Sequence, residues 1–442
     1  MHSLTSSWAG YIALSIFVLA YLLVVFEEKF HLKKSKPVVF AGCFMWFIIG
    51  IYEQSHGNSE KAHEHLQHLI SEIGGLFFFL LVAMTYINTL EERNVFRSLR
   101  SWLLRKGLGF RSMYWATGLI TFFLSPVADN LTSALLMSTI ALSVSNGNAK
   151  FIVPCFINIV VAANAGGAWS PFGDITTLMV WTSGKVPTGK FLYLFIPAII
   201  NWILPAVIMF FFVPNETPQG SKESVPFKPG AKVIMFLGGL TIAMAVSFHQ
   251  FLHLPPFMGM MFGLSFLMFM GYYLKKSEGE SFTEALGISE NSQEKREFEF
   301  YRKVANVDFD TLLFFFGILS AVGALQYIGF LALVSGSLYG TIGALKSNIV
   351  IGILSAIIDN IPIMFAVLKM DPAMGLDQWL LITLTTGVGG SLLSVGSAAG
   401  VAVMGVDRVN YTFLNHLKWM PAVAVGYAAS IFCCWLVTTG LR

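Results

Sequence analysis

The stretch "SPVADNLTSALL", residues 125–136, places a carboxylate, an amide and a hydroxyl inside an apolar run of the sequence. These groups belong to Asp129, Asn130 and Thr132, between "YWATGLITFFL" and "LLMSTIALSV". A charged Asp at the centre of a bilayer costs at least about 2.5–3.5 kcal/mol, so an intramembrane carboxylate is a candidate functional group. Pro126 predicts that the helix is interrupted beside it.

The composition of the chain predicts a membrane protein. The 442 residues are 55% hydrophobic and 12% charged, with a mean hydropathy of +0.68, whereas soluble domains carry about 25% charged residues. Long apolar runs identify the fold class as an all-α polytopic membrane protein. The first run, Trp8 to Phe26, has no basic segment before it and no small-residue cleavage site after it, so we expect it to be retained as a span.

The apolar runs divide into simple spans and interrupted segments. Spans are predicted at residues 8–26, 37–52, 72–90, 152–181, 191–213, 231–251, 255–274, 309–332, 379–406 and 413–439. Two further segments, 113–146 and 346–371, are apolar with polar centres, and the halves of the first are too short to cross the hydrocarbon region. Re-entrant hairpins explain both, because irregular backbone in a membrane must face protein or a water-filled cavity.

The distribution of Lys and Arg predicts the orientation. One set of loops holds 22 of the 28 basic residues: four in 27–36, six in 91–111, three in 214–232, six in 275–306, and Lys150, Arg408 and Lys418. The other set holds Lys61, Lys185, Lys190, Lys346, Lys369 and Arg442. We therefore expect the first set in the cytoplasm, the N-terminus outside, and an insertion in the cytoplasmic (inner) membrane of bacterial type.

Two parts of the chain repeat the same order of motifs. "EIGGLFFFLLVAM", "PVADNLTSALLMS" and "ANAGGAWSPFGDITTLMV" match "DFDTLLFFFGILS", "AIIDNIPIMFAVL" and "TGVGGSLLSVGSAAGVAVM". The predicted orientation inverts one copy relative to the other, which is a recurring plan of secondary transporters. The predicted organisation is N-terminal helices with an external His-rich loop (1–71), repeat one (72–213, hairpin 113–146, broken helix 152–181), connecting helices and a cytoplasmic loop (214–307), and repeat two (308–442, hairpin 346–371, broken helix 379–406).

"SPVADNLTSALLMS" followed by "NAGGAWSPFGDITTLMVW" resembles the NhaD type of sodium/proton antiporter, in the ion transporter superfamily. The resemblance covers most of the chain. It implies about eleven spans plus two hairpins, a homodimer in the lipid bilayer, and export of Na⁺ or Li⁺ in exchange for H⁺ for sodium and pH homeostasis. It implies no cofactor, no enzyme activity and no nucleic-acid partner.

The polar residues of the breaks suit a hard cation, which prefers carboxylate, carbonyl and hydroxyl oxygens. In repeat one the candidate ion-binding residues are Asp129, Asn130, Thr132, Ser125, Asn164 and Asp174, with sodium expected at Asp129, Asn130, Thr132 and Asp174. In repeat two they are Asp359, Asn360, Ser355, Ser394 and Ser397. Competition of Na⁺ and H⁺ for one carboxylate is sufficient for exchange, and Asp129 is the expected shared group. Structural roles in helix capping and packing stay open for these residues.

Three further groups are accessory candidates. Glu72 and Asp310 begin apolar spans, and His65 lies in the His-rich segment, where it shares a helical face with His68 and Glu72. Because His titrates between about pH 5 and 8, the segment is a candidate pH sensor. A zinc site and plain solvated histidines are the alternatives.

Other functions stay open at this level. Transport of arsenite or another oxyanion would need Arg or Lys near the breaks, and the sequence places none there. Related dicarboxylate carriers have a Ser-Asn-Thr motif at each hairpin tip, whereas the tips here read Asp129-Asn130-Leu131-Thr132 and Asp359-Asn360-Ile361-Pro362, which argues against a dicarboxylate carrier. An intramembrane aspartyl protease would use two Asp, but "SPFGD" lacks the first Gly of the Gly-x-Gly-Asp arrangement. A channel fits paired hairpins less well than alternating access does.

Overall fold

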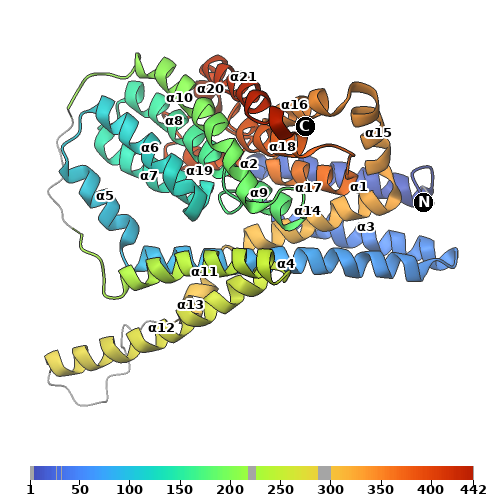
Figure 1. The fold of residues 1–442 in the computed structure, drawn as a ribbon, viewed down its shortest axis with the longest axis horizontal. Coiled ribbons are helices and arrows are strands. Elements are labelled where there is room, and N and C mark those ends of the chain that lie inside the picture. Colours follow the sequence, from blue (N-terminus) through green and yellow to red (C-terminus); the bar gives the residue numbers. More distant parts are fainter. Residues whose placement is uncertain (1–3, 26, 31, 218–224, 287–299, 442) are drawn as a thin grey trace.

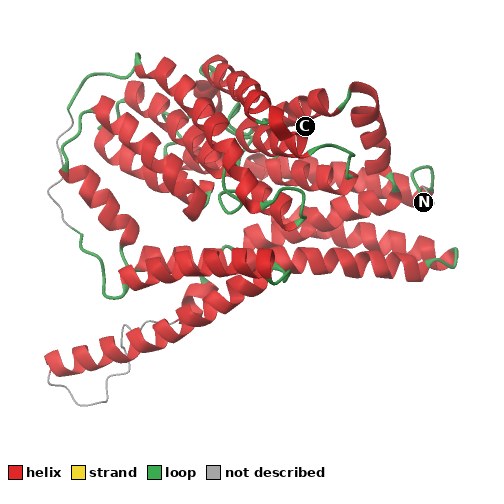
Figure 2. Ribbon diagram, in the orientation of Figure 1, coloured by secondary structure: helices red, strands yellow, loops and turns green. Residues whose placement is uncertain are grey.

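The structure of the chain is a computed structural model that describes residues 4–25, 27–30, 32–217, 225–286 and 300–441. Every regular element in these ranges is a helix (Figure 2). Eight helical segments of the described residues are long and apolar enough to cross a membrane: Ser35–Ser55, Ser59–Glu92, Ala149–Ala168, Thr188–Phe210, Ala231–Phe251, Pro256–Lys276, Phe309–Ile328 and Met420–Val437. The prediction of an all-α polytopic membrane protein is confirmed.

The helices follow the predicted apolar runs. The first half contains α1 (Trp8–Val25), α2 (Glu27–Phe30), α3 (Ser35–Ser55), α4 (Ser59–Glu92), α5 (Val95–Arg105), α6 (Phe110–Ala128), α7 (Asn130–Ser145), α8 (Ala149–Ala168), α9 (Ile175–Thr182), the 3-10 helix η1 (Thr188–Leu194) and α10 (Phe195–Phe210). The second half contains α11 (Ala231–Phe251), α12 (Pro256–Leu286), α13 (Phe300–Ala305), α14 (Phe309–Ile328), α15 (Phe330–Ile342), α16 (Ala344–Leu354), α17 (Asn360–Met370), α18 (Leu376–Gly389), α19 (Ala398–Val406), α20 (Phe413–Leu417), α21 (Met420–Val437) and η2 (Thr439–Leu441).

Several boundaries differ from the prediction, three of them at α4, α6 and α15. The His-rich segment is the first part of the 34-residue helix α4 rather than a loop, because Ala62, Leu69 and Ile73 form a buried stripe that continues the helix. The 19-residue α6 is longer than the expected half-hairpin. Helix α15 follows Gly329, whose φ of 103° ends α14 with a turn that only glycine adopts without strain.

Each predicted polar interruption separates two helices. The chain breaks between α6 and α7 at Asp129, between α8 and α9 at residues 169–174, between α16 and α17 at residues 355–359, and between α18 and α19 at residues 390–397. At the first break Pro126 has no N–H to donate to the carbonyl of Phe122, four residues earlier. Gly166 of α8 packs onto that carbonyl, where an added Cβ would lie 2.3 Å from the oxygen.

The broken helices occupy the centre of the molecule (Figure 1). Helix α8 is buried along its whole apolar length and packs against α6, α7, α10, α18 and α19. Parts from the two halves of the chain alternate at this centre, since α9 contacts α17 and α18 while α19 contacts α7 and α8. Helices α11 and α12 pack against each other and lie along α4, away from this centre.

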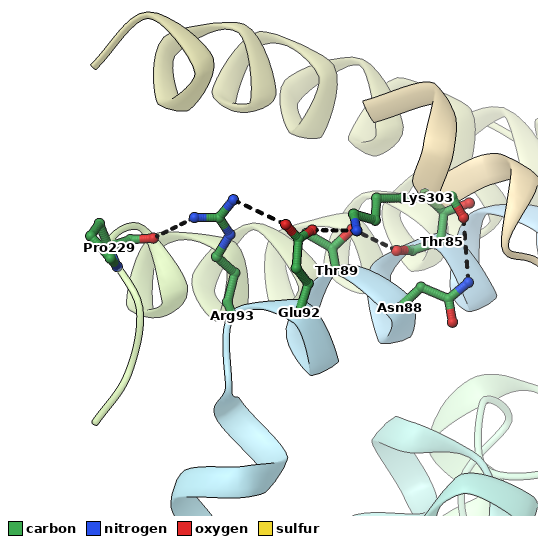
Figure 3. A network of polar contacts seen from close by, with 7 residues as sticks. All are labelled: Thr85, Asn88, Thr89, Glu92, Arg93, Pro229 and Lys303. Atoms are coloured by element: carbon green, nitrogen blue, oxygen red, sulfur yellow. Dashed lines mark hydrogen bonds and ion pairs between the residues drawn. The ribbon is translucent and has the colours of Figure 1, made fainter. Parts of the chain in front are cut away.

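A polar network fastens the end of α4 to the segments around it (Figure 3). Glu92 forms ion pairs with Lys303 of α13 at 2.6 Å and with Arg93 at 3.5 Å. The Arg93 side chain is almost fully buried and donates to the carbonyl of Pro229 at 3.4 Å. The network therefore ties α13 and the segment before α11 to α4. It lies outside the four breaks.

Candidate functional site

The first break is built around a helix cap. Asp129 has a φ of 58° and is the N-cap residue of α7. One of its carboxylate oxygens accepts from the Thr132 backbone N–H at 2.9 Å, and the other accepts from the Thr132 hydroxyl at 3.0 Å. Asp129 and Thr132 are thus brought together as predicted, and the carboxylate carries its charge at the N-terminus of a helix, where the helix dipole favours an anion.

The second break places Asp174 at the start of α9. Asp174 is the N-cap residue, accepts from the Thr176 N–H at 3.2 Å, and is only 5% exposed. Its φ and ψ of −146° and 152° match those of Ser397, at −143° and 152°, which caps α19 in the second half. Ser397 therefore occupies the position that corresponds to Asp174, and the second half lacks this carboxylate.

One oxygen of Asp174 joins the two halves of the chain. The side-chain amide of Asn130 donates to Asp174 Oδ2 at 3.2 Å, and the amide of Asn360 donates to the same oxygen at 3.1 Å. Both asparagines follow the aspartate of their own break, and both are buried. The structure thus places Asp174 where the two Asp-Asn motifs meet.

Asn164 makes a second crossing between the halves. Its Oδ1 accepts from the Asn130 amide at 3.3 Å. Its own amide donates to the hydroxyl of Ser391 at 2.8 Å and to the hydroxyl of Ser397 at 2.9 Å. Since Asn164 is fully buried, it fixes the position of the break between α18 and α19 relative to that between α6 and α7.

Two serines hold the breaks in the same way. Ser125 donates to the carbonyl of Ala163 at 2.7 Å, and Ser355 donates to the carbonyl of Thr386 at 2.7 Å. The first bond joins α6 to α8, and the second joins the end of α16 to α18. The packing matches as well. A Cβ on Gly389 would lie 2.1 Å from the carbonyl oxygen of Gly352, just as a Cβ on Gly166 would lie 2.3 Å from the carbonyl oxygen of Phe122.

Three buried hydroxyls lack a hydrogen-bond partner among the described residues: Ser133, Thr176 and Ser394. Ser394 was predicted, whereas Ser133 and Thr176 were not. Ser133 lies three residues after Asn130 and Thr176 lies two after Asp174, so their place beside the break residues was the available signal. Because buried polar atoms normally have partners, these hydroxyls are further candidate oxygen ligands for a small cation.

The break between α16 and α17 contains an unexpected charge. Asp359 caps α17 through the Ile361 N–H at 3.4 Å, and Lys34 lies 4.0 Å from its carboxylate. The statement that no Lys or Arg lies near the breaks is therefore wrong, because the start of α3 brings Lys34 there from a distant part of the chain. Asp310 accepts a hydrogen bond from Ser35, the residue that follows Lys34. It therefore lies at the start of α3 and not among the residues around Asp174.

The accessory residues Glu72 and His65 lie in a separate cluster. Glu72 pairs with Lys369, in the last turn of α17, and lies 3.3 Å from the ring of His68. His65 packs against Trp46 and Tyr327. The part of the chain that the structure describes contains no group of three His, Cys, Asp or Glu that could hold a metal ion. The cluster therefore does not support the zinc alternative.

The four breaks thus bring carboxylate, amide and hydroxyl oxygens into one buried place. Oxygen donors of this kind bind Na⁺ or Li⁺, and a buried carboxylate also binds a proton. Helix ends leave backbone carbonyl and N–H groups without partners inside their own helix, and transporters use such ends at their ion sites.

Comparisons with known proteins agree with this architecture. A family model described as "Citrate transporter" matches residues 21–389. The chain is 48% identical over 436 residues to the "Na(+)/H(+) antiporter NhaD" of Vibrio cholerae serotype O1, covering 97% of this chain and 91% of that protein. It is 50% identical over 437 residues to the protein of the same name from Alkalimonas amylolytica, covering 97% and 90%. It is 31% identical to "Sodium/proton antiporter 1" of Arabidopsis thaliana over 429 residues, covering 94% of this chain and 70% of that protein. The chain therefore belongs to the NhaD-type sodium/proton antiporters, a group within the family that the citrate-transporter model describes.

Proposed function

We propose that the chain is a secondary transporter that exports Na⁺, and also Li⁺, in exchange for H⁺. The observation that carries the proposal is the buried Asp174 carboxylate, which receives the Asn130 amide from one half of the chain and the Asn360 amide from the other. A group that both halves hold can change its access when the halves move against each other. The names of the relatives support the choice of ions.

The chemistry follows from competition at a carboxylate. Na⁺ binds the ionised form and H⁺ removes that form, so one site carries either ion but not both. We place the ion at Asp129, Asn130, Thr132 and Asp174, with Asn164, Asn360, Ser125, Ser355, Ser394 and Ser397 as positioning groups or additional ligands. Ser133 and Thr176 join this set because their hydroxyls are buried and unpartnered within the described residues.

The same proposal includes the arrangement in the membrane. Residues 72–213 and 308–442 form two inverted repeats with re-entrant hairpins, and the N-terminus lies outside. The matched serine bonds and the matched glycine contacts support the repeat, and the distribution of Lys and Arg supports the orientation. We also propose a homodimer, which light scattering of the detergent-solubilised protein would test through its molar mass.

A carboxylate substrate is less well supported. Citrate carries several negative charges and requires a site with net positive charge. The basic side chain that the described residues bring to the breaks, Lys34, is paired with Asp359. The four breaks therefore offer more negative than positive charge, as a cation site does.

The test is exchange in everted vesicles. A pH gradient formed by respiration should collapse when Na⁺ or Li⁺ is added to vesicles that contain the protein, and K⁺ serves as the comparison ion. Vesicles without the protein should keep the gradient. A gradient that citrate collapses and Na⁺ leaves intact would overturn the proposed function.

A further inference from the structure

Lys34 is a half-buried cation placed at the edge of the proposed ion site. Its side chain is 25% exposed and the Asp359 side chain is 19% exposed, with 4.0 Å between the ammonium and the carboxylate. The ammonium also lies 4.4 Å from the centre of the Phe314 ring, which is fully buried on α14. An ion pair and a cation–π contact together hold the ammonium at one position.

Asp359 is connected to the centre of the site through its neighbour. The amide of Asn360 donates to Asp174 Oδ2 at 3.1 Å, so the Asp359 backbone is directly joined to the group that holds the Asp174 carboxylate. Because Asn360 directly follows Asp359, the carboxylates of Asp359 and Asp174 lie near each other, and like charges at short range in a poorly screened interior repel. A change of charge at Asp359 therefore acts on Asp174 without a direct contact.

The charges at the breaks need a second cation. Asp129, Asp174 and Asp359 together carry three negative charges when ionised, whereas one Na⁺ supplies one positive charge. Within the described residues, Asp129 and Asp174 have hydrogen-bond donors but no ion-pair partner. Another titratable side chain that interacts with Asp359 is Tyr21 of α1, which brings no positive charge.

We propose that Lys34 is a tethered counter-cation that neutralises Asp359 and thereby sets the Na⁺ affinity of the site. This inference rests on the proposed function. Lys34 is the ion-pair partner of Asp359, so Na⁺ and H⁺ exchange at Asp129 and Asp174. Lys34 is a positioning residue in this scheme, because it acts through Asp359 and does not touch the transported ion. Asp310, which accepts a hydrogen bond from Ser35, the residue after Lys34, is a further acidic group on this side of the pair.

The substitution Lys34→Gln tests the proposal. It leaves one additional negative charge near the site, which attracts Na⁺ and H⁺ alike. At a pH above the range in which H⁺ competes, the half-saturating Na⁺ concentration should fall by on the order of 10-fold. In a separate titration, the pH of half-maximal exchange should rise. Lys34→Arg keeps the charge and should stay near the wild-type values. Lys33→Gln, at the exposed neighbouring position, is the matched control and should change neither value.

The variant Asp359→Asn tests the same pair from the other side. It leaves the Lys34 charge without its partner, so the half-saturating Na⁺ concentration should rise. Both single variants should lower the thermal midpoint, and the double variant should lose less than the sum of the two, because it leaves neither half-buried charge without its partner. If Lys34→Gln fails to accumulate, the comparison of Asp359→Asn with the double variant carries the test, since removing Lys34 should then strengthen Na⁺ binding.

Two results would overturn this role of Lys34. One is that folded Lys34→Gln keeps the half-saturating Na⁺ concentration and the pH profile of the wild type, or that the double variant keeps those of Asp359→Asn. The other is additive loss of stability in the double variant. Either result, in the presence of normal wild-type exchange, would leave the proposed function intact, whereas wild-type vesicles without Na⁺-dependent proton movement would refute the proposed function itself.

Discussion

Replacing Asp174 with Asn removes one negative charge where the broken helices meet and nearly keeps the shape of the side chain. The carboxylate uses both oxygens: Oδ2 accepts from Asn130 at 3.2 Å and from Asn360 at 3.1 Å, and Oδ1 accepts from the Thr176 N–H at 3.2 Å. An amide has one oxygen and one NH₂ group. If the new NH₂ group replaces Oδ2, it faces the amides of Asn130 and Asn360. If it replaces Oδ1, it faces the Thr176 N–H.

Two magnitudes follow from this geometry. The better orientation keeps the two asparagine bonds and leaves the Thr176 N–H facing the NH₂ group, which costs about 1–3 kcal/mol of folding stability. The lost charge affects Na⁺ binding more strongly, because two opposite charges about 4 Å apart attract by about 4 kcal/mol at an effective dielectric constant of about 20. At about 1.4 kcal/mol per tenfold change, Na⁺ binding weakens by roughly 10³-fold.

The assay is Na⁺-dependent collapse of the pH gradient in everted vesicles, with the thermal midpoint of the purified protein measured in parallel. Asp174→Asn should insert and fold, and should show no exchange at Na⁺ concentrations that saturate the wild type. Asp308→Asn is the matched control, because Asp308 also caps a helix, α14, but is exposed and lies outside the breaks. Half-saturation within about threefold of wild type in a folded Asp174→Asn variant would refute the reasoning.

Three further outcomes are expected. The variant Asp129→Asn should keep the α7 cap, since Asn caps helices as well as Asp does, and should lose Na⁺-dependent proton movement; normal exchange would show that the Asp129 charge is structural. Cysteines introduced in place of Lys150 and Lys369 should be labelled from the cytoplasmic side and from the outside, respectively. Labelling of both positions from one side would contradict the re-entrant hairpins. Gly166→Ala should lower the free energy of unfolding by about 1–3 kcal/mol or prevent folding, because its Cβ would lie 2.3 Å from a backbone oxygen. Gly74→Ala, with open space around it, should be neutral in a thermal melt. Equal thermal midpoints for the two variants would argue against the close packing of α8 on α6.

The breaks themselves could be predicted from sequence because their causes are local. Pro126 removes a backbone donor wherever it stands in a helix, and Asp129 begins a helix by capping N–H groups within three residues of itself. The length and apolarity of each run predicted the main helices for the same reason. Where a boundary was wrong, as in the His-rich start of α4, burial against distant elements had extended a helix beyond its apolar part.

The partners of the buried charges could not be predicted from sequence, because they depend on how distant helices cross. Asp174 and Asn360 are separated by 186 residues, yet their contact makes Asp174 the meeting point of the two halves. Lys34 and Asp359 come from opposite ends of the chain, and only the packing of α14 along α3 brings the start of α3 to the break before α17. The sequence by itself thus determined the membrane fold, the position of each break and the oxygen-rich chemistry of the site. The tertiary structure decided which groups meet at the Asp174 carboxylate and which aspartate lies beside a lysine, because electrostatic interactions depend on distance in space and not on order along the chain.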